Sequence, residues 1–189
     1  MNLIGTKNLE TERLILRKVK KEDSEEAYNN WCNSDKVSKY VVWEKHNNVQ
    51  VTKELFELWE NDYENLDTFR WIVELKDTHE LIGTIDVMGK KYFKYDVCEI
   101  GYCYGENFWY KGYASERLKR VIEYLFEEVG FEVIYANHLI NNPGSGKVME
   151  KSGMTKEGIL RGRMIDKEGI RNDLISYSIT KDEYFNNKK

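Results

Sequence analysis

Proline is almost absent from this chain of 189 residues, and Pro143 is its single example. No proline-rich linker therefore divides the sequence, which also contains no internal repeat and no low-complexity tract. A chain of this length without an evident boundary is most simply one globular domain with a sizeable core. We expect that domain to span residues 1–189.

Paired cysteines are also missing. The chain has three cysteines, Cys32, Cys98 and Cys103, and none stands in a CxxC pair. This usage fits neither a disulfide framework nor a zinc site, and it is typical of proteins in a reducing compartment. We expect the three side chains to be small apolar core residues, and we expect no metal centre.

Long apolar runs and an excess of basic charge are lacking as well. No stretch approaches the length of a membrane span, and residues 1–14 have no apolar signal core. The formal net charge is −4, from 29 Lys and Arg against 33 Asp and Glu, without a long basic run. We therefore expect a cytoplasmic protein that binds neither membranes nor nucleic acid.

The apolar residues that are present predict a mixed α/β or α+β sheet domain, because alternating and helical spacings both occur. A capping-box-like start, with Asp23 three residues before Glu26, predicts an early helix. The segment 89–96 reads as a hairpin connection, and Gly101 inside a strand suggests a bulge or the close approach of another backbone. The expected strands are 13–17, 69–75, 81–87, 97–104, 131–137, 154–164 and 173–179, and further helices are expected at 51–59, 114–125 and 143–151.

The segment WYKGYASE (109–116) places Gly112 and Lys111 directly before the most strongly amphipathic helix. The first backbone N–H groups of a helix have no partner within the helix, and a glycine there would let an anion such as a pyrophosphate approach them. On these eight residues alone, a helix entry that merely needs a flexible residue is the simpler interpretation.

Two glycine-containing motifs for nucleotide binding are not matched by the sequence. The run GSGK (144–147) resembles the end of a phosphate-binding P-loop, but Asn141 stands where that motif needs a glycine and Val148 where it needs Ser or Thr. No GxGxxG dinucleotide fingerprint follows a strand. Neither class of nucleotide-binding motif is therefore present.

Taken together, several segments resemble the GNAT superfamily of N-acetyltransferases, in particular the RimJ/RimL-like branch that acetylates the N termini of ribosomal proteins. They are EIGYCYGENFWYKGYASERL (99–118), NPGSGKVMEKSGM (142–154), LETERLILRKVKKED near the start and EGILRGRMIDKEGIRNDLISYSI near the end, with LIGTIDV between them. The resemblance implies the GNAT fold, a mixed and mostly antiparallel sheet of about seven strands flanked by about four helices.

The resemblance also implies acetyl-coenzyme A as a cosubstrate. Its pyrophosphate would lie on the backbone N–H groups around Gly112, and its pantetheine arm would pair with the strand before the loop. In the family, Gln or Arg often stands where this chain has Trp109, although this branch tolerates tryptophan. The residues implied in coenzyme binding are Tyr102, Cys103, Tyr104, Trp109, Tyr110, Lys111, Gly112, Tyr113, Ala114 and Asn142.

Two residues are candidates for the chemistry that the resemblance implies. Glu99 lies where the family commonly holds its general base, and a solvent-facing strand carboxylate is the alternative; Asp86 and His138 are weaker candidates. Many members use a tyrosine to protonate the leaving thiolate, but that position is Met149 here. Ser145 would replace it, as is thought for the ribosomal-protein branch. Asn142 and Ser145 equally fit plain helix-entry positions.

The expected function is thus transfer of an acetyl group to a primary amine by direct transfer in a ternary complex, and the alternative is a non-catalytic acyl-coenzyme A sensor. The acceptor is expected between the early helices and the late strand turn, and it could be a ribosomal-protein N terminus, a polyamine or an aminoglycoside-like amine. A homodimer is possible. Aromatic residues available near such a pocket are Trp31, Tyr40, Trp43, Trp59 and Tyr63.

Overall fold

The computed structural model describes residues 1–188, and contacts between these residues form two compact units. The first unit contains residues 1–2, 88–101 and 118 onward, and the second contains residues 3–87 and 102–117. Strand β5 (Val97–Tyr104) and helix α4 (Tyr113–Tyr124) each have residues in both units.

Hydrogen bonds join eight strands of the described chain in the order β1-β2-β3-β4-β5-β6-β8-β7. Only β5 and β6 pair in parallel among the pairings whose register is known. The mixed, mostly antiparallel α/β sheet predicted from the sequence is therefore confirmed. The other strands are β1 (Leu9–Glu10), β2 (Leu14–Arg17), β3 (Arg70–Leu75), β4 (Leu81–Met88), β6 (Val133–Leu139), β7 (Thr155–Ile165) and β8 (Arg171–Thr180).

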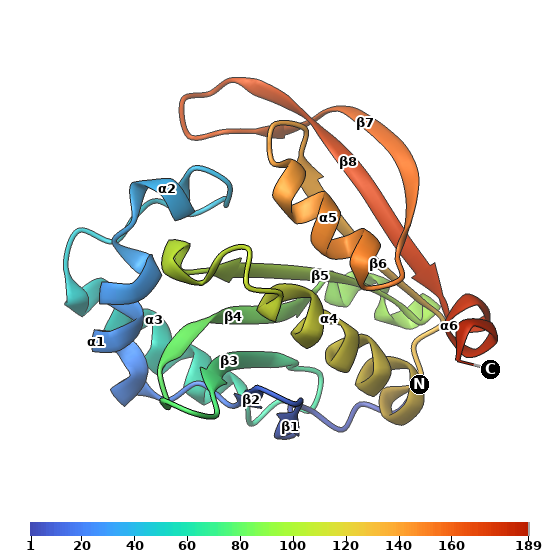
Figure 1. The fold of residues 1–189 in the computed structure, drawn as a ribbon, viewed down its shortest axis with the longest axis horizontal. Coiled ribbons are helices and arrows are strands. Elements are labelled where there is room, and N and C mark those ends of the chain that lie inside the picture. The colour runs from blue at the N-terminus through green and yellow to red at the C-terminus, as the bar shows by residue number, and fades with distance from the viewer. Residues whose placement is uncertain (189) are drawn as a thin grey trace. The chain divides into compact units, whose positions relative to one another are not determined.

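The second unit packs its helices over an apolar cluster that includes Trp31, Phe56 and Ile72. Helices α1 and α3 lie side by side there (Figure 1). Trp31 is fully buried in this cluster, while Trp43, Trp59 and Tyr63 pack against it, so these rings serve mainly as core. The helices of this unit are η1 (Lys21–Asp23), α1 (Ser24–Ala27), η2 (Tyr28–Cys32), α2 (Asp35–Ser38), α3 (Val49–Asp62) and η4 (Glu106–Phe108).

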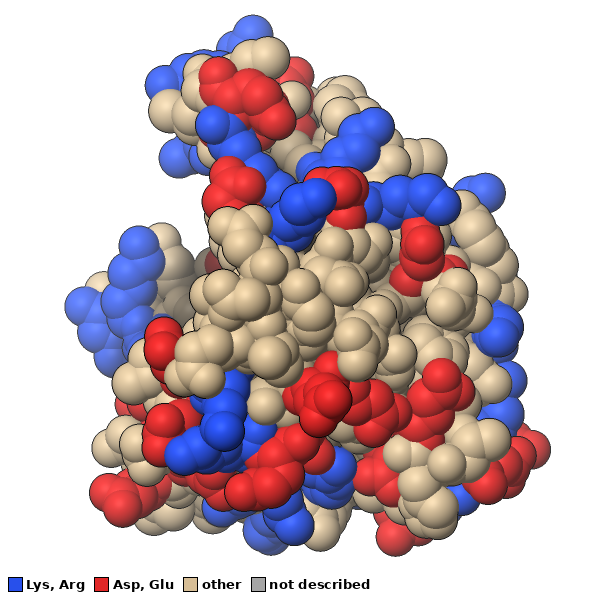
Figure 2. All heavy atoms as spheres, turned by 90° about the vertical axis from the view of Figure 1, so that its left-hand side faces the viewer, with Lys and Arg blue, Asp and Glu red and all other residues tan. Residues whose placement is uncertain are grey.

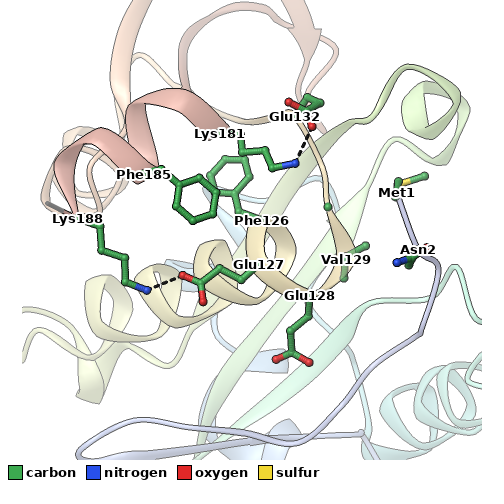
Figure 3. A pocket seen from close by; sticks show the side chains of 11 residues that line it. Met1, Asn2, Phe126, Glu127, Glu128, Val129, Glu132, Lys181, Phe185 and Lys188 are labelled. Atoms are coloured by element: carbon green, nitrogen blue, oxygen red, sulfur yellow. Dashed lines mark hydrogen bonds and ion pairs between the residues drawn. The ribbon is translucent and has the colours of Figure 1, made fainter.

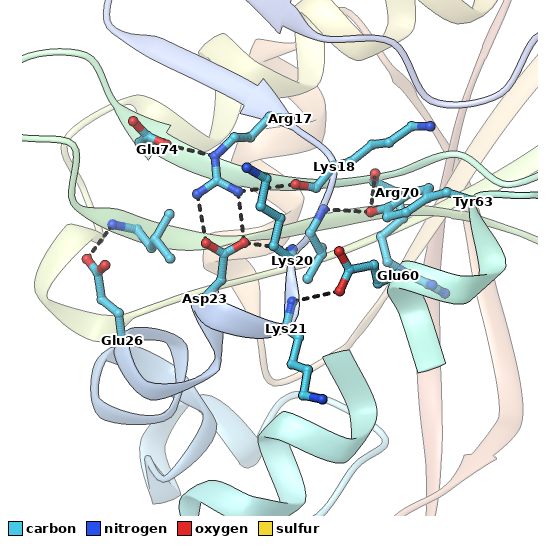
Figure 4. Close-up of polar contacts among 12 residues, drawn as sticks. Arg17, Lys18, Lys20, Lys21, Asp23, Glu26, Glu60, Tyr63, Arg70 and Glu74 are labelled. Atoms are coloured by element: carbon cyan, nitrogen blue, oxygen red, sulfur yellow. Dashed lines mark hydrogen bonds and ion pairs between the residues drawn. The ribbon is translucent and has the colours of Figure 1, made fainter. Parts of the chain in front are cut away.

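The early helix does not begin with the predicted capping box of Asp23 and Glu26. Asp23 instead receives two hydrogen bonds of 2.8 Å from the Arg17 guanidinium, whose Nε donates to Glu74 at 2.9 Å (Figure 4). Glu26 accepts from the backbone N–H of Leu81 at 2.7 Å. Both carboxylates therefore tie the N-terminal segment to the sheet, while Asp23 also accepts from the Lys20 N–H at 2.8 Å at the start of η1.

Gly83 is the glycine that a close backbone approach requires. A Cβ on Gly83 would lie 2.2 Å from the Cys103 carbonyl oxygen, so no side chain fits between β4 and β5 at this point. Of the two interpretations of Gly101, the close approach of another backbone is wrong. A Cβ on Gly101 would instead meet the Met88 side chain, 2.5 Å from Cε.

The first unit contains the parallel pairing of β5 with β6 and the long hairpin of β7 and β8 (Figure 1). Helix α5 (Pro143–Lys151) has the predicted bounds, because Asn142 caps its start and Gly153, at φ 90°, follows its end. The segment 89–96 forms a 3₁₀ helix, η3 (Lys90–Tyr95), and α4 continues into a π-helix, η5 (Leu125–Val129). Helix α6 (Lys181–Asn187), which was not predicted, starts with a capping box of Thr180 and Glu183.

Basic and acidic side chains are interleaved on the face of the molecule that Figure 2 presents. Within residues 1–188, no helix is long and apolar enough to cross a membrane.

Candidate active site

The loop that enters α4 has an unusual backbone. Tyr110 and Gly112 both have positive φ angles, 64° and 85°, and the Tyr110 side chain is 96% exposed. A left-handed conformation is uncommon for a residue other than glycine, and strain of this kind gathers at binding sites. The indole N–H of Trp109 anchors the loop by donating to the Tyr104 carbonyl at 3.0 Å.

The backbone N–H groups of residues 111–114 form no hydrogen bond within the described chain. The Gly112 carbonyl, in contrast, accepts from the Glu116 N–H at 3.1 Å and from the Ser115 hydroxyl at 3.0 Å. The helix entry therefore presents donors and no competing acceptor, and this arrangement attracts an anion.

Arg13 occupies the space beside Gly112. A Cβ on Gly112 would lie 3.3 Å from Arg13 Nη2, which is tighter than ordinary contact. Arg13 donates through Nη1 to the Lys111 carbonyl at 3.1 Å, and its guanidinium lies 4.4 Å from the centre of the Tyr113 ring. Gly112 is thus required both by its backbone angle and by the arginine packed against it.

In the strand predicted to bind the coenzyme, Tyr102 to Tyr104, two of the three side chains point into the protein. The Tyr104 ring is buried, and the Cys103 thiol lies 3.4 Å from the Thr84 hydroxyl, where burial raises the pKa of the thiol. These side chains belong to the interior of the second unit. Hydrogen bonding to an extended ligand would therefore involve the main chain.

Arg117, one turn into α4, is fully buried. Its Nη1 donates to the Thr84 carbonyl at 2.8 Å, and the guanidinium lies 4.1 Å from the centre of the Tyr104 ring and 5.2 Å from that of Tyr102. Its Nε and Nη2 have no hydrogen-bond partner in residues 1–188. Burial lowers the pKa of Arg117, although an arginine remains charged under ordinary conditions.

Glu99 lies in the first unit at the end of the parallel ladder, opposite Tyr135 on β6. Its two carboxylate oxygens accept from the Tyr135 hydroxyl at 3.2 Å and from the Asn137 amide at 2.9 Å. Since the carboxylate only accepts, the Asn137 amide must point its nitrogen at Glu99. Asn137 Oδ1 is then a buried acceptor with no partner among the described residues. Glu99 is therefore a positioned carboxylate and not a freely rotating surface group.

Asn142 and Ser145 form the entry of α5, also in the first unit. Asn142 Oδ1 accepts from the Ser145 N–H at 3.4 Å, a long hydrogen bond, and Pro143 follows at the first helical position. Met149, where the resemblance places the family's tyrosine, is 1% exposed and belongs to the core. Of the groups predicted near this entry, Ser145 is thus the one that carries a transferable proton.

The two weaker base candidates have other partners. Asp86 accepts from Arg70 Nε at 2.6 Å. His138 has its Nδ1 2.7 Å from the Leu139 carbonyl and its ring packed under Gly146, so its Nδ1 carries the hydrogen. His138 Nε2, beside Gly146, is a buried atom with no hydrogen-bond partner among the described residues.

Residues 13–155 match the model of the acetyltransferase (GNAT) domain. The chain belongs to the GNAT family of acetyltransferases. The uncharacterized N-acetyltransferase YoaA of Bacillus subtilis is 34% identical over 92% of this chain and 96% of its own length. A GNAT-family acetyltransferase structure from Bacillus anthracis has a TM-score of 0.80 at 27% identity, covering 93% of this chain and 99% of that one. The [ribosomal protein uS5]-alanine N-acetyltransferase of Escherichia coli is 26% identical over 56% of this chain and 55% of its own.

The GNAT residues predicted from the sequence fall in both units. Tyr102 to Tyr104 and Trp109 to Ala114 belong to the second unit, whereas Glu99, Asn142 and Ser145 belong to the first. A cavity of about 550 Å³ in the first unit contains none of them (Figure 3). Its two lysines, Lys181 and Lys188, are already paired with Glu132 and Glu127.

Sequence reasoning missed the residues that hold the predicted site residues in place within each unit. Arg13 and Glu116 are 103 positions apart, and Asn137 is 38 positions from Glu99. No periodicity links such residues. The one available signal was the segment LETERLILR, which the resemblance included without assigning a role to its first arginine.

Proposed function

We propose that this GNAT acetyltransferase moves the acetyl group of acetyl-coenzyme A to a primary amine by direct transfer in a ternary complex. The observation that carries the proposal is the entry of α4, where the N–H groups of residues 111–114 are without acceptors in the described chain. These groups suit the coenzyme's pyrophosphate. The end of the parallel ladder at Glu99 leaves Tyr102 to Tyr104 suited to pairing with the pantetheine arm.

In the proposed reaction, the amine nitrogen attacks the thioester carbonyl carbon, so that a C–N bond forms and the C–S bond breaks. Glu99, directly or through a water molecule, receives the proton that the nitrogen loses. The Ser145 hydroxyl donates a proton to the departing thiolate and regains one from solvent. A thiol has a pKa of about 8.5, so this last donation contributes less than it would for a poorer leaving group.

The acceptor that we propose is the N terminus of a protein, with polyamines and aminoglycoside-like amines as further members of a test panel. The family relationship to an enzyme that acetylates uS5 supports this choice. An α-ammonium has a pKa of about 8, against about 10.4 for a lysine side chain, so it needs less help from a base near neutral pH.

The test measures coenzyme A binding by titration calorimetry and the release of free thiol from acetyl-coenzyme A. The panel contains peptides with free alanine, serine or methionine N termini, spermidine and an aminoglycoside; each peptide is matched by its N-acetylated form. We expect coenzyme binding, and thiol release with a free N terminus that disappears with the blocked peptide. Coenzyme binding without turnover on the whole panel would contradict the proposal.

A further inference from the structure

The Arg13 side chain connects the start of the sheet to the coenzyme loop of the second unit. Its Nε donates to Glu116 Oε2 at 2.7 Å, its Nη2 lies 2.6 Å from the same oxygen, and its Nη1 donates to the Lys111 carbonyl at 3.1 Å. One guanidinium therefore bonds both the loop and the first turn of α4. Arginine suits this geometry because its planar donors point in fixed directions.

Glu116 is itself fixed by the segment before β2. Its Oε1 accepts from the Thr11 hydroxyl at 2.5 Å and from the Arg13 backbone N–H at 3.0 Å. Burial works to raise the pKa of Glu116, but the hydrogen bonds from Thr11 and Arg13 outweigh it, and the pKa is lowered. The carboxylate therefore stays charged and holds Arg13 in one orientation.

The bond from Arg13 to Lys111 sets the direction of a peptide plane. The described chain has no cis peptide bond, so the Gly112 N–H points away from the Lys111 carbonyl. Since that carbonyl faces Arg13, the Gly112 N–H faces the opposite side of the loop, where its hydrogen has no acceptor in residues 1–188. The arginine thus determines where one of the anion-binding donors points.

We propose that Arg13 is a positioning residue for the coenzyme's pyrophosphate: it fixes the Lys111–Gly112 peptide so that the Gly112 N–H meets the anion. This inference rests on the proposed function. With three of its nitrogens engaged by Lys111 and Glu116, the guanidinium acts mainly through the loop. Its 41% exposed side chain adds positive charge nearby.

The test compares coenzyme A with pantetheine, which lacks the phosphates, in wild type, Arg13→Met and Arg13→Lys. Arg13→Met removes the donors and keeps most of the stem. We expect its Kd for coenzyme A to rise about tenfold, as for a lost charge-assisted hydrogen bond, while its Kd for pantetheine is unchanged. Arg13→Lys keeps the charge without the fork of donors, and we expect an intermediate Kd.

Lys21→Met is the matched control, because Lys21 pairs with Glu57 at 2.7 Å in the same unit and is similarly exposed, at 35%. We expect it to leave both Kd values unchanged, and thermal melting by circular dichroism checks that each variant is folded. An equal loss for both ligands would show a general structural role, and an unchanged coenzyme Kd in Arg13→Met would also overturn the inference. Failure of the wild type to bind coenzyme A would contradict the proposed function itself.

Discussion

Helices α4 and α5 begin in opposite ways. At α5, the Asn142 side chain accepts the Ser145 N–H and Pro143 supplies a position that needs no donor. At α4, the N–H groups of residues 111–114 make no such bond within the described residues, and the chain enters through left-handed Tyr110 and Gly112. One helix is thus capped by a side chain of the protein, whereas the first N–H groups of the other have no such cap.

The difference supports the proposal that the α4 entry, and not the α5 entry, receives the ligand. An unsatisfied helix start costs stability, and strained left-handed residues cost more. The α5 entry has a side-chain cap of its own, so Asn142 and Ser145 have a structural role whether or not they also contact the coenzyme. The α4 entry leaves its first N–H groups to solvent or to an external acceptor, and the proposed pyrophosphate would be such an acceptor.

Gly112→Val is expected to have the largest effect. A left-handed residue other than glycine costs about 1–2 kcal/mol, and the new side chain would press on Arg13. We expect the Kd for coenzyme A to rise about 100-fold, the equivalent of two steps of 1.4 kcal/mol, with the fold largely retained. Calorimetry measures the affinity and circular dichroism the fold; an unchanged Kd would reduce the open entry to a simple turn.

Ser145→Ala tests the chemistry at the capped entry. The cap bond uses the Ser145 backbone N–H and the Asn142 side chain, so the helix start should survive. We expect kcat to fall about tenfold, which is below the usual range for the loss of a general acid, because the thiolate leaves readily. The Kd for coenzyme A should change far less. Full turnover by the variant would remove Ser145 as the acid.

Two substitutions of Asn142 distinguish its role as a helix cap from a contact with the coenzyme. Asn142→Ala should lower the free energy of unfolding by about 1 kcal/mol, and Asn142→Ser should restore most of it because serine also caps. Neither variant retains the amide N–H₂ donor, so we expect a roughly threefold weaker coenzyme affinity in both, the lower part of the range for one hydrogen bond. If serine restored affinity together with stability, Asn142 would act through the cap alone.

Lowering the pH should destabilise the folded protein through His138, and this is the smallest of the expected effects. Burial lowers the pKa of His138 below its ordinary value, so the unfolded chain binds more protons than the folded one when the pH falls below about 6.5. The free energy of unfolding should therefore decrease from pH 7.5 to 5.5, and burial of His46 adds in the same direction.

The measurement is urea unfolding at both pH values. His138→Gln should reduce the pH dependence, because it removes the buried imidazole whose pKa is lowered. Equal pH dependence in wild type and His138→Gln would show that the buried imidazole is not responsible.

Local sequence signals predicted a helix correctly where capping residues stand at its own ends. Helix α5 was predicted at its exact bounds because Asn142, Pro143 and Gly153 are all local signals. The capping box of α6 was equally legible in Thr180 and Glu183 and was overlooked. The Asp23–Glu26 prediction failed because Asp23 accepts from Arg17 and from the Lys20 N–H, and Glu26 accepts from the Leu81 N–H, which is distant in sequence.

The candidate site was predictable as a set of segments but not as a geometry. The ordered motifs identified the loop at Gly112, yet the sequence could not show that Arg13 fills the space beside it. Asn137 likewise carries no signal until strand pairing brings β6 beside β5. Contacts that depend on strand register appear only once the sheet is formed.

The burial of Arg117 has a consequence for ionic strength. Exposed charges are screened by dissolved ions over about 10 Å at 0.1 M salt, whereas buried charges are screened much less. Arg13, 41% exposed, loses influence as salt rises, but Arg117 is fully buried one turn further along α4. The positive potential at this helix entry therefore has a component that salt weakens less, and attraction for an anion there should fall with ionic strength less steeply than exposed Arg13 alone would predict.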